Sequence, residues 1–380
     1  MQVRRLDFAS GFGDLIPAWD ELLGQARRPN VFMTRSWLQH WSNHLGAAHD
    51  AWVLAVHDDE GRLAGAAALV LIERGYLGLR ELTFMGTGAA GADHLDFISS
   101  RGEEAAVTDA ICRYLRAHSD QWDVLRLTDL PRDSTTPLAL QRHFNDDFVH
   151  RQTAGAACPY LPLAGSWQTY LERQSRNFRQ QTRSKRRQFE QLSHSRFVAC
   201  DKPAEVERAM QCLFRFNPER WNARGDGSAF ADQKFQDFHL DIAGQFLSQG
   251  WLDLYYLEIE NQIAAVIYGF AYLNRIYFYN SGFDPRWSKY SLGRVLMAYH
   301  VQSAFERGFD EYDFLRGNHS YKYAWTTTQR RNLDVMILRR SPKTLARYRV
   351  NRGLHLARRT VKRHLPHILR HGLKTVPSSA

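Results

Sequence analysis

The sequence has few cysteines and no long apolar run. Its 380 residues include four scattered cysteines, none in a Cys-x-x-Cys pair: Cys112, Cys158, Cys200 and Cys212. This usage argues against a disulfide framework or a zinc site and predicts reduced thiols in the core. No run reaches the roughly 18 apolar residues that a membrane-spanning helix needs, and the N-terminus lacks the apolar core of a signal peptide. We therefore expect a cytoplasmic protein.

Several catalytic motifs are also missing. The sequence has no Gly-x-Ser-x-Gly, no Walker loop and no zinc-ligand spacing, which argues against a hydrolase, an ATPase or a metalloenzyme. A literal Gly-x-Gly-x-x-Gly occupies residues 86–91, and Glu103 lies at about the right distance for a ribose contact. Residues 92–100 alternate like a strand or loop, however, so no helix dipole would face a pyrophosphate. We interpret this motif as a flexible turn.

Acidic residues are absent from the C-terminal tail. From Arg339 onward there are twelve Lys or Arg and no Asp or Glu, while the whole chain carries +10. The basic charge therefore belongs mostly to the tail. We expect a helix over 341–374 with apolar residues spaced by three and four: Val350, Leu354, Ala357, Val361, Leu365 and Ile368. Such a helix can lie on an anionic membrane, at the inner face; the alternative is a helix packed on the domain with a frayed end.

The composition, 44% hydrophobic and 24% charged, is typical of a soluble globular protein. The length of 380 residues is sufficient for two domains. Residues 1–164 have the strand and helix pattern of one α/β unit, and Gly165 and Ser166 mark the expected boundary. The expected helices are 15–25, 36–45, 103–118 and 137–144, and the expected strands are 52–56, 63–72, 80–85, 122–127 and 148–163, the last interrupted at Pro159.

Residues 165–340 form the second expected unit, followed by the tail at 341–380. A long helix over 167–192 carries six arginines with few acids opposing them: Arg173, Arg176, Arg179, Arg183, Arg186 and Arg187. This helix is either a solvated face or a docking surface for a polyanion such as tRNA. Helices at 204–221 and 233–248 and a hairpin at 251–258 and 262–272 follow.

A strand, loop and helix then suggest an anion site. Residues 276–281 alternate with period two and break at Gly282. Ser291 is placed to cap a helix that Gly308 would end. Free N–H groups at such a helix start bind phosphate, and the loop also carries Arg286 and Lys289. The alternative is an ordinary crossover connection without a ligand.

An ordered set of short motifs runs through the second unit. It comprises Arg220-Trp221, Gly250-Trp251-Leu252, Gly282-Phe283-Asp284-Pro285, Ser291-Leu292-Gly293, Asp313-Phe314-Leu315-Arg316-Gly317 and Tyr321-Lys322-Tyr323-Ala324-Trp325. From about 165 to 330 this set resembles the GNAT acyl-CoA-dependent acyltransferases, in particular the CelD-like branch named for cellulose biosynthesis, which is related to the FemAB aminoacyltransferases. The resemblance implies an α/β (α+β) fold of tandem GNAT-like units, each a mixed, mostly antiparallel sheet flanked by helices.

The resemblance also implies a site. Acyl-CoA, most simply acetyl-CoA, would be held without a metal by a strand edge and the phosphate loop: Tyr279, Ser281, Gly282, Arg286, Lys289, Tyr290, Ser291, Gly293 and Arg294. The catalytic candidates are Asp313, His319, Tyr321 and Lys322. Among them His319 is a candidate base, Tyr321 a proton donor to the leaving thiolate, and Lys322 a ligand of phosphate or acceptor. Alternatively Asp313 pairs with Arg316, and Tyr321 is a core aromatic. Acceptor binding is assigned to Arg220, Trp221 and Arg224.

Three functional hypotheses follow. The first is transfer of an acyl group from acyl-CoA to an amine or hydroxyl of a cell-envelope or exopolysaccharide-related acceptor. The second is a FemAB-like transfer from aminoacyl-tRNA, in which the basic helix meets the nucleic acid. The third is a non-catalytic, membrane-peripheral assembly factor with a degenerate GNAT core.

Overall fold

One twisted sheet runs through the molecule. The computed structural model describes residues 1–6, 16–47, 49–75, 77–222 and 229–364. Within them the strand order is β1 (Gln2–Leu6), β2 (Asp50–His57), β3 (Leu63–Arg74), β4 (Leu79–Phe84), β6 (Val124–Pro131), β13 (Gln329–Arg339), β7 (Phe148–Pro162), β12 (Glu311–Asp313), β11 (Arg275–Phe283), β10 (Gln262–Tyr272), β9 (Leu252–Ile259) and β8 (Arg196–Ala199), with β5 (Ile98–Ser99) beside β3.

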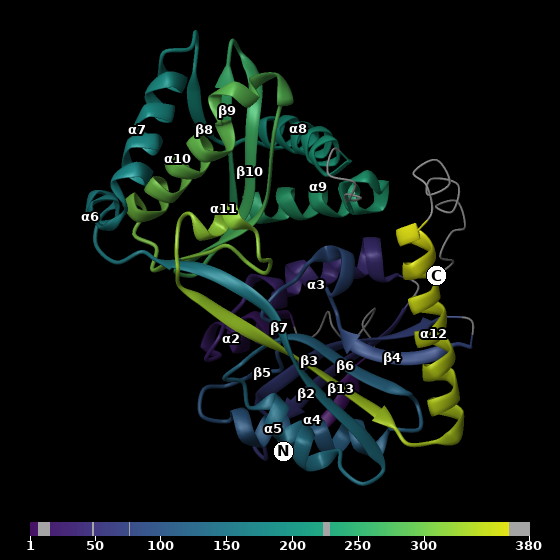
Figure 1. Cartoon of the computed structure of the whole chain (residues 1–380). Coiled ribbons are helices and arrows are strands. Elements are labelled where there is room, and N and C mark those ends of the chain that lie inside the picture. Colours follow the sequence, from purple (N-terminus) through teal and green to yellow (C-terminus); the bar gives the residue numbers. More distant parts are fainter. Residues whose placement is uncertain (7–15, 48, 76, 223–228, 365–380) are drawn as a thin grey trace.

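The strands pair antiparallel except at β4·β6 and β11·β12, which confirms a mixed, mostly antiparallel sheet. We call β1–β7 with β13 the N-terminal half and β8–β12 the C-terminal half. Figure 1 shows the two halves one above the other, joined through β7. Helices flank both, as the sequence predicts.

The helices are named in chain order. In the N-terminal half they are α2 (Ile16–Gln25), α3 (Arg35–Trp41), α4 (Glu104–Ala117) and α5 (Thr136–His143), and in the C-terminal half α6 (Trp167–Arg173), α7 (Arg176–Glu190), α8 (Pro203–Asn222), α9 (Gln233–Ser248), α10 (Leu292–Glu306) and α11 (Ser320–Tyr323). Helix α12 (Pro342–His364) follows β13. Short 3₁₀ helices are η1 (Val31–Met33), η3 (Gly88–Ala90), η4 (Ala229–Ala231) and η5 (Pro285–Tyr290), and a short π-helix is η2 (Ser42–Gly46).

The core of the C-terminal half lies on both faces of its sheet. Along β10, Val266 and Phe270 face a cluster that includes α8 and α9, whereas Ala265 and Ile267 face one that includes α7 and α10. Side chains alternate across a strand, so a strand covered on both faces must be apolar throughout. This explains the unbroken run QIAAVIYGFAY.

Strand β13 belongs to the N-terminal half, although the C-terminal half precedes it in the sequence. It follows the C-terminal half in sequence, yet it lies between β6 and β7, pairing with both in antiparallel register. The long strand β7 pairs with β13 over most of its length and with β12 at Tyr160–Pro162. The division at residues 164 and 165 stays a prediction, and a strand from the second predicted unit completes the sheet of the first.

Three local predictions were wrong. The predicted helix over 167–192 is two helices, because the Ser175 side chain caps α7 by accepting from Phe178 N (3.2 Å) and Gln174 is extended. Strand β7 is not interrupted at Pro159, whose carbonyl accepts from Phe314 N (3.0 Å). Ser291 precedes α10 but makes no side-chain cap, since it adopts the left-handed conformation (φ +55°). Gly308 does end α10 with a positive φ, as predicted.

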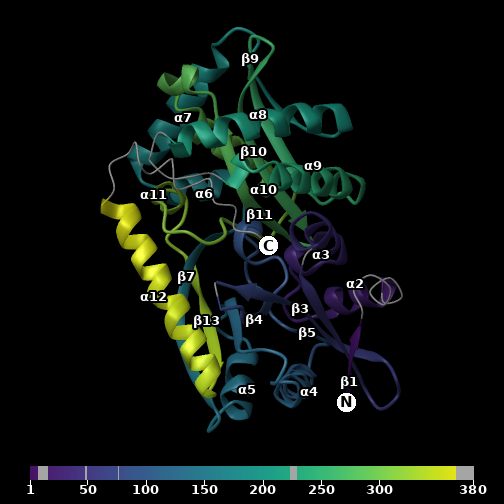
Figure 2. The ribbon, with the colours of Figure 1, turned by 90° about the vertical axis from the view of Figure 1, so that its right-hand side faces the viewer.

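Helix α12 lies along the outer edge of the N-terminal half (Figures 1 and 2). Leu345 and Tyr348 pack on a small core cluster, and Thr344 Oγ1 donates to the buried Asp123 carboxylate (3.0 Å). No helix among the described residues is long and apolar enough to cross a membrane.

Candidate functional site

Strands β11 and β12 run together for three residues and then part. Their parallel pairing ends at Tyr277 and Asp313. Beyond it β11 continues along β10 as far as Phe283, whereas the chain after β12 follows β7, with Phe314 N donating to Pro159 O. We call this parting the fork. Past the fork, β11 has no strand partner on its β12 side within the described residues, so its edge has backbone groups for a ligand.

At the far end of β11 stands the start of α10. Ser291 N donates to Ser288 O (3.1 Å) and Arg294 N to Ser291 O (2.9 Å). An α-helix leaves its first N–H groups without partners inside the helix, which here are those of Leu292 and Gly293. Gly293 is exposed, so this helix end is open to an anion.

The basic residues predicted around this turn differ in the contacts that they already make within the protein. Arg286 makes a paired contact with Asp284 (Nη2–Oδ2, 2.6 Å), which neutralises much of its charge. Lys289 lies over the Tyr290 ring (4.9 Å), and both residues are at the surface. Arg294 lies over the Phe178 ring (5.5 Å), and its buried Nη1 has no hydrogen-bond partner in the described part of the chain.

The side chains of β11 mostly serve packing. Tyr279 lies between the two halves: its hydroxyl donates to Ala90 O of the N-terminal half (2.7 Å) and is 3.0 Å from His239 Nε2 on α9. Burial raises the pKa of Tyr279, so the hydroxyl stays neutral. At Gly282 a Cβ would lie 2.8 Å from Phe216 Cβ, which requires glycine. Tyr279 and Gly282 therefore offer a ligand mainly their backbone, whereas Ser281 N already donates to Asn280 Oδ1 (2.8 Å).

Below the fork lies a buried ion pair between the two halves. Asp313 Oδ2 is 3.1 Å from His94 Nε2, and His94 Nδ1 is 3.0 Å from Asn332 Oδ1. Burial opposes the charge on Asp313, but His94 outweighs it and lowers the pKa of the carboxyl to about 2. Burial likewise opposes the charge on His94, and Asp313 outweighs it, raising the pKa of the imidazole. Asp313 Oδ1 accepts from Leu315 N (2.7 Å), so this carboxylate positions the next loop.

Lys322 lies inside that loop. Its side chain is 4% exposed, and Nζ donates to Leu315 O (3.1 Å) and Arg316 O (2.7 Å). Burial lowers the pKa of Lys322 to about 8, although Asp93 and Asp313 nearby favour its charge. Near neutral pH the amine can therefore gain or lose a proton, and it has a third N–H position.

Three residues of this buried cluster have an unfavourable backbone conformation. Leu315, His94 and Asp129 all have positive φ, between 54° and 61°, which costs about 1–3 kcal/mol for each non-glycine residue. Arg316 Nη1 pairs with Asp129, and Arg316 N donates to Asp93 Oδ2 (2.6 Å). Burial raises the pKa of Asp129 to about 6, against the attraction of Arg316. Strain gathered at one buried polar cluster is typical of functional sites.

The other catalytic candidates lie at the surface above Lys322. His319 and Tyr321 are exposed and stack with ring centroids 5.9 Å apart. Arg316, predicted as an alternative partner of Asp313, pairs instead with Asp129. The acceptor candidates Arg220 and Trp221 are in α8 with side chains outside the described set, and Arg224 lies outside the described residues.

The sequence interpretation missed the N-terminal share of this cluster. Asp93 and His94 follow the glycine-rich motif, which forms the single turn η3 with no α-helix after it, as predicted. The C-terminal half holds this segment through Tyr279 at Ala90 O and Arg316 at Ala92 O (3.3 Å). Polar residues directly after a glycine-rich turn were the one signal available.

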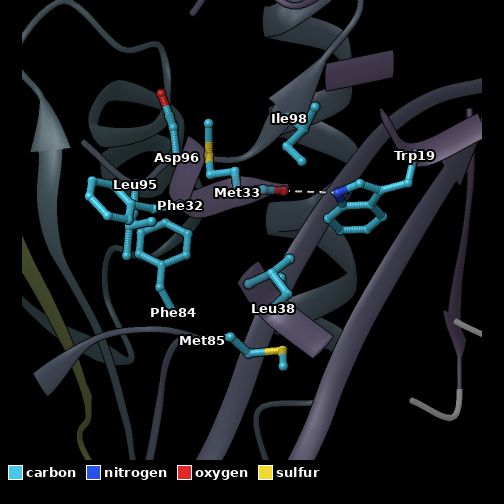
Figure 3. Close-up of a pocket in the computed structure, with 10 residues that line it drawn as sticks. Trp19, Phe32, Met33, Leu38, Phe84, Met85, Leu95, Asp96 and Ile98 are labelled. Atoms are coloured by element: carbon cyan, nitrogen blue, oxygen red, sulfur yellow. Dashed lines mark hydrogen bonds between the residues drawn. The ribbon is translucent and has the colours of Figure 1, made fainter. Parts of the chain in front are cut away.

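A small cavity elsewhere in the molecule does not compete with this site. It lies in the N-terminal half, and Figure 3 shows it lined by apolar side chains such as Phe32, Leu38 and Phe84, with Asp96 at its rim. Trp19 Nε1 donates to Met33 O beside it (2.9 Å). Its volume of about 10 Å³ holds roughly one water molecule.

A row of arginines lies on the outer face of α7. Arg176, Arg183 and Arg187 are exposed and share one face of α7, since they are seven and four residues apart. Lys185 Nζ contacts Lys289 O (3.4 Å), so the face of α7 beside η5 is the opposite one, because Lys185 lies roughly 200° around the helix from Arg183. Arg186 instead stacks on Tyr299 (4.1 Å), and Arg179 Nη1 donates to Gln174 O (2.6 Å). The basic face is thus only partly free.

Comparison with known proteins gives one family match and several structures of similar fold. Residues 176–323 match the family model described as acetyltransferase (GNAT) domain. The fold is similar to the crystal structure of FemX (TM-score 0.63, 11% identity, 88% of this chain and 97% of that chain). It is also similar to L-PGS from Bacillus licheniformis (0.52, 13%, 92% and 97%) and to the C-terminal domain of a putative lysylphosphatidylglycerol synthetase from Agrobacterium fabrum (0.51, 10%, 92% and 96%). No curated protein matches significantly.

At such low identities the solved structures show a shared fold, and the CelD-like branch stays a prediction. Together with the family match, the fork, the open start of α10 and the order of elements around them lead to one conclusion. Residues 176–323 match the model of a GNAT acetyltransferase domain, in a chain that shares the fold of FemX.

Proposed function

We propose that this protein transfers an acyl group from acyl-CoA, most simply acetyl-CoA, to an amine or hydroxyl of a cell-envelope or exopolysaccharide-related acceptor. The observation that carries the proposal is the fork between β11 and β12. The open start of α10 lies beyond the far end of β11, and the ionisable Lys322 lies in the loop that follows β12. A structure of the same fold is named a putative lysylphosphatidylglycerol synthetase, which supports an acceptor in the cell envelope.

The donor would lie along β11. Amide groups of its pantetheine arm would pair with the free backbone edge past Tyr277, and its pyrophosphate would meet the N–H groups of Leu292 and Gly293. The thioester would then reach the fork near Asp313 and Lys322. Binding along a fixed strand edge orients the carbonyl for attack and reduces the entropic part of the barrier.

The reaction needs one proton removed and one returned. The acceptor nitrogen or oxygen attacks the thioester carbonyl, its proton passes to the neutral amine of Lys322, and the carbon–sulfur bond breaks to release CoA thiolate. That thiolate takes a proton from Tyr321 or from the Lys322 ammonium. Asp313, ionised and bound to His94, acts as a positioning residue for the loop that holds Lys322.

The donor assignment is tested by Gly293→Glu. The new carboxylate would stand where the phosphates bind, so we expect acetyl-CoA binding to be lost in calorimetry. The stabilisation of about 2.7 kcal/mol that a ligand gives at a hundred times its dissociation constant would be lost with it. Gly293→Ala is the matched control, because its Cβ would make only ordinary contact with Phe283 at 3.9 Å. Equal affinity in Gly293→Glu and the parent would reject this placement.

The basic row of α7 favours a second candidate, transfer from aminoacyl-tRNA as in the FemAB aminoacyltransferases that the sequence resembles. The exposed row of Arg176, Arg183 and Arg187 offers a nucleic acid donor three cations on a helix whose opposite face contacts η5. If no CoA thioester binds the parent protein, tRNA is the next donor to measure. If neither binds, the non-catalytic hypothesis remains.

Salt dependence tests the second candidate. Replacing Arg176, Arg183 and Arg187 by Gln is expected to reduce the slope of log affinity for tRNA against log salt by roughly 2 to 3, since each phosphate contact contributes about 0.7–0.9. Arg113→Gln, at an exposed site on α4, should leave the slope unchanged. A slope that does not depend on the α7 row would contradict docking there.

A further inference from the structure

Helix α12 has two different faces. Thr344, Leu345 and Tyr348 pack inward, and Arg347 Nη1 contacts the buried Asp123 carboxylate (3.1 Å). At 3.6 residues per turn, Val350 and Leu354 lie roughly 200° and 240° around the helix from Tyr348. They are 43% and 40% exposed, among the few large apolar side chains that the described surface leaves open. The apolar stripe predicted from the sequence therefore begins on the face that the domain does not cover.

Cations lie on and beside this face. Lys343 lies between Val350 and Leu354 around the helix, roughly 220° from Tyr348, and Arg349 flanks them at roughly 100°. Both are exposed, and neither has an ion-pair partner within the described residues. No Asp or Glu occurs in the sequence from Arg339 onward. Cations that flank apolar side chains are the composition of helices that lie at the surface of anionic bilayers, where the apolar side chains enter the acyl boundary and the cations meet lipid phosphates.

We propose that the outer face of α12 docks this protein on an anionic lipid surface. The occupant is a bilayer rather than a nucleic acid, because two large apolar side chains lie among the cations, and a nucleic acid backbone gives them nothing to contact. The helix lies at an edge of the molecule in both Figure 1 and Figure 2, so a flat surface can approach it. This inference goes beyond the proposed transfer reaction and does not depend on it.

The test is flotation of the full-length protein with phosphatidylcholine vesicles, with and without phosphatidylglycerol. We expect binding only to the vesicles with phosphatidylglycerol, weakening as salt rises. Lys343→Gln with Arg349→Gln should lower the partition coefficient roughly 25-fold, because each cation near such a surface contributes about a fivefold factor. Val350→Gln with Leu354→Gln should lower it further toward background.

Matched controls exist on other helices. Leu138→Gln removes a side chain that is 65% exposed on α5, and Arg113→Gln removes an exposed cation on α4; neither should change flotation. All variants should bind acetyl-CoA as the parent does, so failure here is distinct from failure of the donor site. The proposal would be overturned if the parent protein did not float with the vesicles, or if every variant floated equally. It would also be overturned if the parent bound duplex RNA and the variant Val350→Gln with Leu354→Gln bound it equally well.

Discussion

Replacing Lys322 by Met is expected to slow acyl transfer by about 10²- to 10⁴-fold, the usual contribution of a positioned acid or base. Lys322 is the ionisable group at the fork whose pKa, lowered by burial to about 8, lies close to working pH. Hydroxylamine is a small nucleophile that can replace the unidentified acceptor. Release of CoA from acetyl-CoA in its presence gives the rate.

The pH dependence separates chemistry from structure. If the neutral amine removes the proton, the parent rate should rise with pH and level off above about 8. Lys322→Arg keeps a cation that cannot take up a proton in this range, so its slow rate should lack that inflection. Both variants should still bind acetyl-CoA. A normal rate in Lys322→Met, or the same inflection in Lys322→Arg, would assign proton transfer elsewhere.

Replacing Asp313 by Ala is expected to lower the free energy of unfolding by about 3–5 kcal/mol, because it leaves His94 as an uncompensated buried charge. Asp313→Asn is the matched control, since its side-chain oxygen can still accept from Leu315 N. A double-mutant cycle with His94→Gln, followed by chemical denaturation, isolates the ion pair from other losses. A coupling energy near zero would contradict the assignment.

The same pair sets a pH window for stability. The pKa of Asp313 is depressed to about 2, so its contribution is complete above the unfolded value of about 3.9 and is lost as pH falls toward 2. The pKa of His94 is raised, so its contribution is complete below about 6.5 and is lost as pH rises through the folded value. We expect the pair to stabilise the fold most between pH 4 and 6.5, a maximum that Asp313→Asn should flatten.

The sequence predicted well those elements that local patterns determine. Helix α9 was predicted with its observed bounds, and β10, β11 and α10 were predicted to within a few residues. Their apolar periodicity and their end signals, such as Gly308, lie within the elements themselves. The break between α6 and α7 was missed because the apolar stripe of the predicted helix continues across it, and only the cap by Ser175 stops the helix.

The buried cluster was much harder to predict. Asp313 pairs with His94, 219 residues earlier in the chain, and no local pattern relates the two. Asp313 and Lys322 came from the family resemblance, Asp93 had only its place after a glycine-rich turn, and Asn332 carried no signal of its own. The sequence also overestimates how many arginines are available to a ligand. Arg286 pairs with Asp284 and Arg186 stacks on Tyr299, and both contacts depend on tertiary packing that no local pattern shows.

The placement of β13 between β6 and β7 has a consequence for synthesis. On the ribosome, β6 and β7 emerge long before β13, and the whole C-terminal half must follow before β13 can be inserted between them. Until then two strand edges stand open, which is the state in which nascent chains aggregate or pair wrongly. We therefore expect the N-terminal half to mature last although it is made first, and fragments that end before Arg339 to need chaperones to stay in solution.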